Sequence, residues 1–72
     1  MKIIYDKEAD SAYIYLSKNG DIKGELVKDT YSCDPDVVGG MINLDFNEKG
    51  VMIGIEVLDA SKKLNPEVLE NM

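Results

Sequence analysis

Two acidic side chains, Asp45 and Glu56, form the pair that the sequence best places for acid–base chemistry. In the alternating pattern of two neighbouring strands, both point to the same face of a sheet. Cutting a polymer with such a pair also requires a cleft with stacking aromatic side chains. The chain has no Trp and only 72 residues. We therefore expect Asp45 and Glu56 to be surface charges and not a catalytic pair.

The other residue types that serve most enzymes are scarce. The sequence contains no His, which removes the most common general base near neutral pH and most zinc sites. The lone thiol, Cys33, lies between Ser32 and Asp34 with no Arg or His to stabilise its thiolate. We expect Cys33 to be a loop residue, and we expect no catalytic constellation and no cofactor.

Asp6, Glu8 and Asp10 alternate like the first oxygen ligands of a calcium-binding loop. Such a loop also needs a Gly at its sixth position and a Glu at its twelfth. Ser11 and Ser17 occupy those two positions. A solvated turn is therefore expected here. A weak divalent-cation site, or an enzyme that uses surface carboxylates, is kept as a further alternative.

The composition is that of a small acidic domain. The chain is expected to form one domain over residues 1–72, and its formal charge is −6, with Lys as the only basic residue type. Nucleic-acid recognition relies on clustered Lys and Arg, so we expect no nucleic-acid partner. The single Cys33 favours a reducing compartment. The N-terminal apolar run is too short for a signal peptide or a membrane span, so we expect a cytoplasmic protein without membrane contact.

Alternation of apolar and polar residues predicts an antiparallel sheet over most of the chain. The expected strands are residues 2–5, 11–17, 21–31, 41–46 and 51–58. Asn19-Gly20 is typical of a tight hairpin, and residues 47–50 form a second turn that ends in Gly. The Pro and Gly residues of the segment 32–40 predict a loop.

The pattern changes near the C-terminus from strand to helix. Ala60 to Leu64 can form one turn, and Asn65-Pro66-Glu67 supplies a cap, a first-turn Pro and an early acid. Val68, Leu69 and Met72 are expected to pack this helix against the sheet. The fold class is therefore α+β, an antiparallel β-meander of about four to five strands with a short C-terminal helix.

The hairpin of residues 41–58 presents two faces. The expected core face carries Ile42, Leu44, Phe46, Val51, Ile53, Ile55 and Val57, and the second face carries Met41, Asn43, Asp45, Met52, Gly54, Glu56 and Leu58. Tyr and Met are enriched in protein interfaces. The candidate interaction face therefore consists of Tyr13, Tyr15, Met41, Met52 and Leu58. The sequence leaves open the alternative that the C-terminal helix covers part of this face.

Two stretches of the chain resemble a known family. Residues 5–14 read Tyr-Asp-Lys-Glu-Ala-Asp-Ser-Ala-Tyr-Ile, and residues 54–61 read Gly-Ile-Glu-Val-Leu-Asp-Ala-Ser. With the turn from Asp45 to Gly50 between them, they resemble the DUF2283 family of small bacterial and archaeal proteins. Residues 29–40 are longer here than in that family. The resemblance implies binding and not catalysis, because some members resemble antitoxin-like partners of small toxin candidates.

The matching residues also have a structural interpretation. Asp6 is expected to close an Asx-type turn, and Asp59 and Ser61 are expected to cap the first helical turn. The leading hypothesis is therefore a protein-binding or self-associating module, with a homodimer as the expected assembly and a basic protein as a second kind of partner. The alternative is an antitoxin-like protein that neutralises a small basic toxin.

Overall fold

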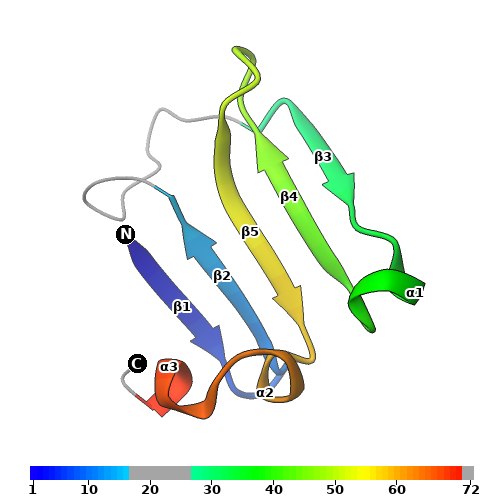
Figure 1. Ribbon diagram of the computed structural model, residues 1–72. Helices are drawn as coiled ribbons and strands as arrows, with labels where there is room; N and C mark the ends of the chain where they lie inside the picture. The colour runs from blue at the N-terminus through cyan, green and yellow to red at the C-terminus, as the bar shows by residue number, and fades with distance from the viewer. Residues whose placement is uncertain (17–26, 71–72) are drawn as a thin grey trace.

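The computed structural model describes residues 1–16 and 27–70. These residues form, in order, β1 (Lys2–Asp6), β2 (Ser11–Tyr15), β3 (Asp29–Ser32), α1 (Pro35–Val38), β4 (Ile42–Phe46), β5 (Met52–Leu58), α2 (Ala60–Lys63) and α3 (Pro66–Glu70). Figure 1 shows the five-stranded sheet, with α2 and α3 near the lower end of β1, β2 and β5 and with α1 beside the lower end of β3. The expected α+β fold with an antiparallel sheet and a short C-terminal helix is confirmed. None of the helices in these two ranges is long and apolar enough to cross a membrane.

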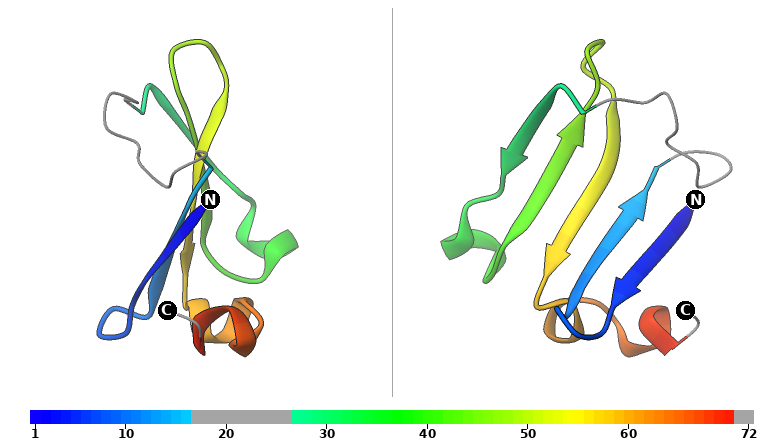
Figure 2. Two further views of the ribbon diagram at one scale, coloured as in Figure 1. Left: turned by 90° about the vertical axis from the view of Figure 1, so that its left-hand side faces the viewer. Right: turned by 180° about the vertical axis from the view of Figure 1, so that it is seen from behind.

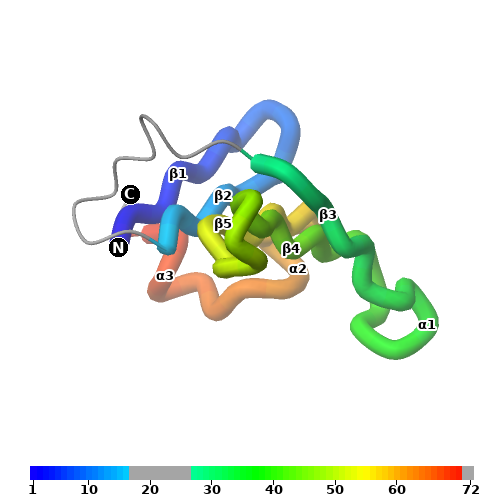
Figure 3. The backbone as a smooth tube through the Cα atoms, turned by 90° about the horizontal axis from the view of Figure 1, so that it is seen from above, coloured from blue at the N-terminus to red at the C-terminus, as the bar shows by residue number. Residues whose placement is uncertain are grey.

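The strands lie in the order β1-β2-β5-β4-β3, and every neighbouring pair is antiparallel. β5 therefore lies at the centre of the sheet, between β2 and β4, while β1 and β3 form its two edges (Figure 3). The predicted hairpin turn at Asn19-Gly20 lies outside the described residues. Of the third strand, expected over residues 21–31, residues 29–31 belong to β3, which extends to Ser32 and pairs with β4. Residues 27–28 are not in a strand, and residues 21–26 lie outside the described residues.

The register of the strands gives the sheet two chemically different faces. The first, which we call the apolar face, carries Ile3, Tyr5, Ala12, Ile14, Tyr31, Ile42, Leu44, Ile55 and Val57. The second, which we call the polar face, carries Lys2, Ile4, Asp6, Ser11, Tyr13, Tyr15, Thr30, Ser32, Asn43, Asp45, Gly54, Glu56 and Leu58.

The two C-terminal helices pack on the apolar face. Ala12 of β2, Val57 of β5 and Ala60 of α2 form the buried cluster, and Leu64 packs against it. Figure 2 shows α2 and α3 together on one side of the sheet. The small side chains of Ala12 and Ala60 let the helix approach the strands closely. No helix of the described part of the chain lies on the polar face, so the alternative of a face covered by the C-terminal helix is wrong.

The segment 32–40, expected to be a loop, contains the one-turn helix α1. Asp34 caps it by accepting a hydrogen bond from the Asp36 N–H at 2.9 Å, and Pro35 occupies the first helical position. Gly39 ends the helix in the left-handed region, at φ 70°. The cap and the Pro were visible in the sequence as Asp34-Pro35-Asp36, which is a helix start signal as well as a turn signal.

The β4–β5 hairpin contains a register shift that the alternating pattern did not predict. Asp45 pairs with Gly54, but Phe46 pairs with Met52, so Ile53 is an extra residue on β5 and is buried. Such a bulge shifts the facing order of the strand that carries it. Met52, expected on the second face beside Gly54 and Glu56, instead lies opposite Phe46, an expected core residue.

Candidate functional site

A hydrogen-bond network centred on Asp45 crosses the polar face. The Asp45 side chain accepts a hydrogen bond from the Tyr13 hydroxyl at 2.5 Å and another from the Thr30 hydroxyl at 2.6 Å. These two donors belong to β2 and β3, on opposite sides of the β5–β4 pair. The network therefore ties four neighbouring strands together through side chains, in addition to their backbone ladder.

Gly54 makes the long reach of Tyr13 possible. The ring of Tyr13 passes over β5 at Gly54, where a β-carbon would lie 2.5 Å from two of its ring carbons. Only Gly leaves the space through which Tyr13 crosses to Asp45. Tyr15 packs beside Tyr13, with ring centroids 4.7 Å apart and planes tilted by 49°. The two rings form a fixed aromatic surface on the polar face.

A second chain of hydrogen bonds runs beside the first. The Ser32 hydroxyl donates to Asn43 Oδ1 at 2.8 Å, and Asn43 Nδ2 donates to Glu56 Oε1 at 2.9 Å. These residues come from β3, β4 and β5, so this chain also runs across the sheet. Polar groups of the face are thereby held by one another, which fixes the orientation of Glu56.

The predicted acid pair separates into two different environments. Asp45, expected to be a surface charge, is only 9% exposed, so that prediction is wrong for this residue. Burial and the carboxylate of Asp45 both raise the pKa of the Tyr13 phenol above its usual value of 10, so Tyr13 is a neutral donor near pH 7. Each oxygen of the Asp45 carboxylate accepts one hydroxyl hydrogen bond, so Asp45 stabilises the network from both of its neighbours.

The structure brings together three of the five residues of the candidate interaction face. Tyr13, Tyr15 and Leu58 share the polar face. Met41 precedes β4 and is exposed, and its carbonyl accepts a hydrogen bond from the Leu58 N–H at 3.0 Å, so it lies at the border of the same surface. Met52 is separated from them by the register shift. Sequence alternation placed Asn43 on this surface correctly but did not identify Thr30 or Ile4 as members of it.

A second polar junction lies at the lower end of the sheet, around Asp10. Its carboxylate accepts hydrogen bonds from the Tyr5 hydroxyl at 2.7 Å, the Ser61 N–H at 3.0 Å and the Ser61 hydroxyl at 2.7 Å. The expected cap, Asp59, makes no side-chain cap bond to α2. Asp10 therefore supplies the helix with its cap from 51 residues away in sequence.

The alternating acids at positions 6, 8 and 10 serve as turn and cap residues. Asp6 Oδ1 accepts hydrogen bonds from the Glu8 N–H at 3.0 Å and the Ala9 N–H at 3.2 Å, which confirms the predicted Asx-type turn. The Asp10 carboxylate is directed to Tyr5 and Ser61. Within residues 1–16 and 27–70, no group of three or more His, Cys, Asp or Glu side chains is placed to hold a metal ion.

The family model described as a protein of unknown function, DUF2283, matches residues 2–61. The chain belongs to the DUF2283 family. Searches of curated proteins and of solved structures returned no match. The matched range contains all five strands, both networks of the polar face and the Asp10 junction, and it ends at Ser61. In this DUF2283 domain, α3 lies beyond the matched residues.

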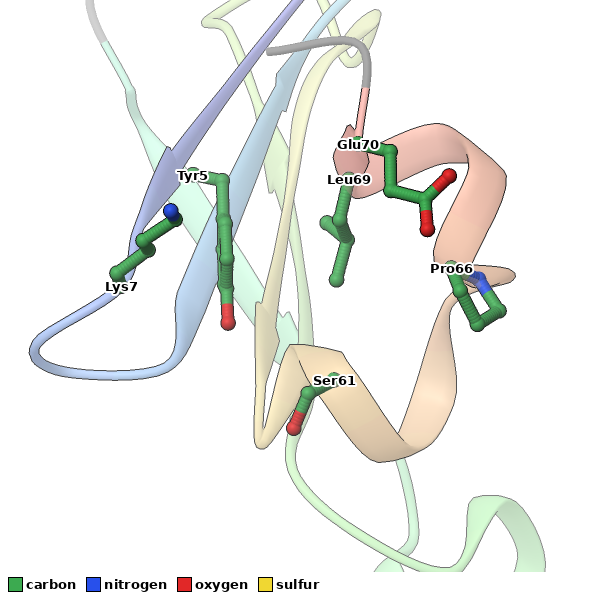
Figure 4. A pocket seen from close by; sticks show the side chains of 6 residues that line it. All are labelled: Tyr5, Lys7, Ser61, Pro66, Leu69 and Glu70. Carbon is green, nitrogen blue, oxygen red and sulfur yellow. The ribbon is translucent and has the colours of Figure 1, made fainter.

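A groove of about 720 Å³ opens between β1 and the C-terminal helices of the DUF2283 domain. It is lined by Tyr5, Lys7, Ser61, Pro66, Leu69 and Glu70. Figure 4 shows the Tyr5 ring standing between β1 and α3, with Leu69 pointing into the space. The sequence did not predict this groove, because its walls come from opposite ends of the chain.

The hydrogen bonds to the Asp10 carboxylate predict how the stability of the domain changes in acid. The hydrogen bonds from Ser61 and then from Tyr5 lower the pKa of the Asp10 carboxyl below its ordinary value of 3.8. A lowered pKa adds stability above the unfolded value, and this stability is lost as the pH falls below about 4. We expect Asp10→Asn, which tolerates the φ of 51° at this position, to lose less stability than the parent between pH 5 and pH 2.

Urea denaturation at a series of pH values measures this difference. Asp29→Asn, at an exposed acid of β3, is the control and should keep the pH dependence of the parent protein. Parallel curves for the parent and Asp10→Asn would show that the junction does not hold the carboxylate in its charged form.

Proposed function

We propose that this domain binds a protein partner through the polar face of its sheet. The observation that carries the proposal is the fixed Tyr13–Tyr15 pair on a face that α2 and α3 leave free. Ile4, at 45% exposure, and Met41 add apolar area at the borders of the same surface. Tyr and Met side chains surrounded by satisfied polar groups are typical of the core of a protein interface.

The charge of the surface favours a basic partner. Among the strand residues that the structure describes on the polar face, Asp6, Asp45 and Glu56 are acidic and Lys2 is basic, and the whole chain has a formal charge of −6. Complementary charge raises the association rate and excludes acidic partners. An antitoxin that neutralises a small basic toxin would be one protein of this kind.

Binding fits these side chains better than catalysis does. Asp45 already accepts two hydroxyl hydrogen bonds, and Glu56 already accepts one from Asn43. Interfaces gain affinity from groups that are ordered before the partner arrives, because less conformational entropy is then lost on binding. The networks of the polar face provide this order.

In-cell photo-cross-linking tests the proposal. A benzophenone amino acid placed at Tyr15 should trap one protein in cells of the source organism. The same amino acid at Val37, which is 79% exposed in α1 and away from the polar face, is the control. If Tyr15 and Val37 trap the same set of proteins, the polar face has no dedicated partner.

The trapped protein is then purified and titrated with the unmodified domain. We expect Tyr15→Ala to weaken binding tenfold or more, whereas Val37→Ala should leave the affinity unchanged. Binding should also weaken as salt is raised from 50 to 300 mM, because complementary charges are screened. Equal effects of the two substitutions would contradict the proposal.

A further inference from the structure

We propose that β1 pairs with β1 of a second copy of this chain, antiparallel, so that two sheets join edge to edge. The inference goes beyond the proposed partner face and does not depend on it. β1 is an edge strand, and no other strand of the described residues pairs with its outer side. Main-chain groups on such an edge are a template for another strand.

The hydrogen-bond pattern shows which groups point outward. The Leu16 N–H donates to the Ile53 carbonyl, so alternate residues of β2 from Leu16 back to Ala12 bond to β5. The intervening residues of β2 therefore bond to Lys2, Ile4 and Asp6 of β1. The peptide groups of Ile3 and Tyr5 point away from the sheet. Within residues 1–16 and 27–70, no strand pairs with these groups.

The sequence of β1 is complementary to itself in one antiparallel register. With Ile4 opposite Ile4 of the second copy, Ile3 faces Tyr5, and each such pair exchanges two backbone hydrogen bonds. In the same register Lys2 lies directly opposite Asp6 on the polar side of the sheet. Two Lys–Asp pairs thus form across a single two-fold axis, as expected for a symmetric dimer.

The neighbouring registers lose this complementarity. If Ile3 lay opposite Ile3, Lys2 would face Ile4. If Tyr5 lay opposite Tyr5, Asp6 would face Ile4. Both leave charged side chains without an opposite charge and shorten the paired segment. The register centred on Ile4 is therefore the one that β1 specifies.

The groove beside β1 provides space for the second copy. In this register the partner's Ile3 lies next to Tyr5 on the apolar side of the joined sheet, where Tyr5 and Leu69 line the groove of about 720 Å³. An Ile side chain entering there would bury apolar surface on both copies. Three features favour a second copy of β1 at this place: an outer edge with which no described strand pairs, opposite charges at matching positions, and the adjoining groove.

The other edge of the sheet is less complementary to itself. β3 has four residues, all exposed, and its central Tyr31 is 60% exposed. In an antiparallel pair centred on Tyr31, Asp29 would face Cys33, so its charge would have no opposite neighbour. Tyr31 therefore serves as the matched control position for Ile4.

Disulfide trapping tests the register directly. Ile4 is a non-hydrogen-bonded position in the proposed pair, where opposite Cα atoms lie about 4.5 Å apart, within the range of a disulfide. In a Cys33→Ser background, we expect Ile4→Cys to form a covalent dimer under mild oxidation at least tenfold faster than Tyr31→Cys or Val51→Cys. Rates equal to that of Val51→Cys, an exposed turn position, would overturn the proposal. Faster cross-linking through Tyr31→Cys would overturn it in favour of the β3 edge.

Charge reversal provides the second measurement, without introduced thiols. Lys2→Glu places two acids opposite each other and should raise the dimer dissociation constant tenfold or more in analytical ultracentrifugation. Lys49→Glu makes the same change of net charge at an exposed residue of the turn between β4 and β5, and it should leave the dimer dissociation constant unchanged. If Lys2→Glu and the parent protein had equal dimer dissociation constants, β1 pairing would be refuted. A parent protein that stays monomeric at millimolar concentration would also refute it. Neither result would affect the photo-cross-linking test of the polar face.

Discussion

Gly54→Ala is expected to destabilise the domain by about 2 kcal/mol, although it adds only one methyl group to the surface of a sheet. The added carbon would overlap the ring and hydroxyl of Tyr13. Tyr13 must then rotate away, which breaks its hydrogen bond to Asp45. Urea denaturation of the purified variants measures the change in the free energy of unfolding.

A double-mutant cycle shows whether Tyr13 causes this loss. In a Tyr13→Ala background, Gly54→Ala should cost less than about 0.5 kcal/mol, because the space is then empty. Gly50→Ala is the control: its φ of 79° makes Ala unfavourable there, but no atom lies near its β-carbon. Its cost should be the same with and without Tyr13. If Gly54→Ala costs the same in both backgrounds, the ring does not cross the strand in solution.

Asp45→Ala is expected to cost about 2 kcal/mol, because the Tyr13 hydroxyl loses a charged acceptor in a partly buried position, whereas the exposed Thr30 hydroxyl can bond to water instead. Asp45→Asn keeps one carbonyl acceptor and should cost about half as much. Thermal or urea unfolding of the three proteins provides the comparison. Asp29→Ala, on an exposed edge, should change stability by less than about 0.5 kcal/mol. A loss below 1 kcal/mol for Asp45→Ala would show that the network contributes little.

The alternating pattern of the sequence predicted the fold but not which polar side chains are buried. Alternation placed Asp45 and Glu56 correctly on one face of the 42–58 hairpin, since side chains of a strand alternate between faces. Whether Asp45 is covered depends on Tyr13, which lies 32 residues earlier. That contact exists because β5 separates β2 from β4. Alternation within a strand carries no information about such an order of strands.

The N-terminal cap of α2 was not predicted from the sequence either, for a similar reason. Asp59 stands immediately before α2 and has the residue type of a cap, yet its backbone is left-handed at φ 53° and its side chain makes no cap bond. Asp10 reaches the same N–H groups because the β1–β2 turn lies beside α2, where the Ala60 N–H donates to the Asp10 carbonyl at 2.9 Å. Sequence rules find caps that are adjacent in the chain, and this one is adjacent only in space.

Contact between a partner protein and the polar face can be mapped at single methyl groups. Methyl cross-saturation by NMR, on the complex with the protein trapped through Tyr15, locates that contact. A partner on the polar face should cause signal loss at the methyl groups of Ile4, Met41 and Leu58. Signal loss instead at Val37, Val68 and Leu69, which belong to the helices α1 and α3, would contradict it.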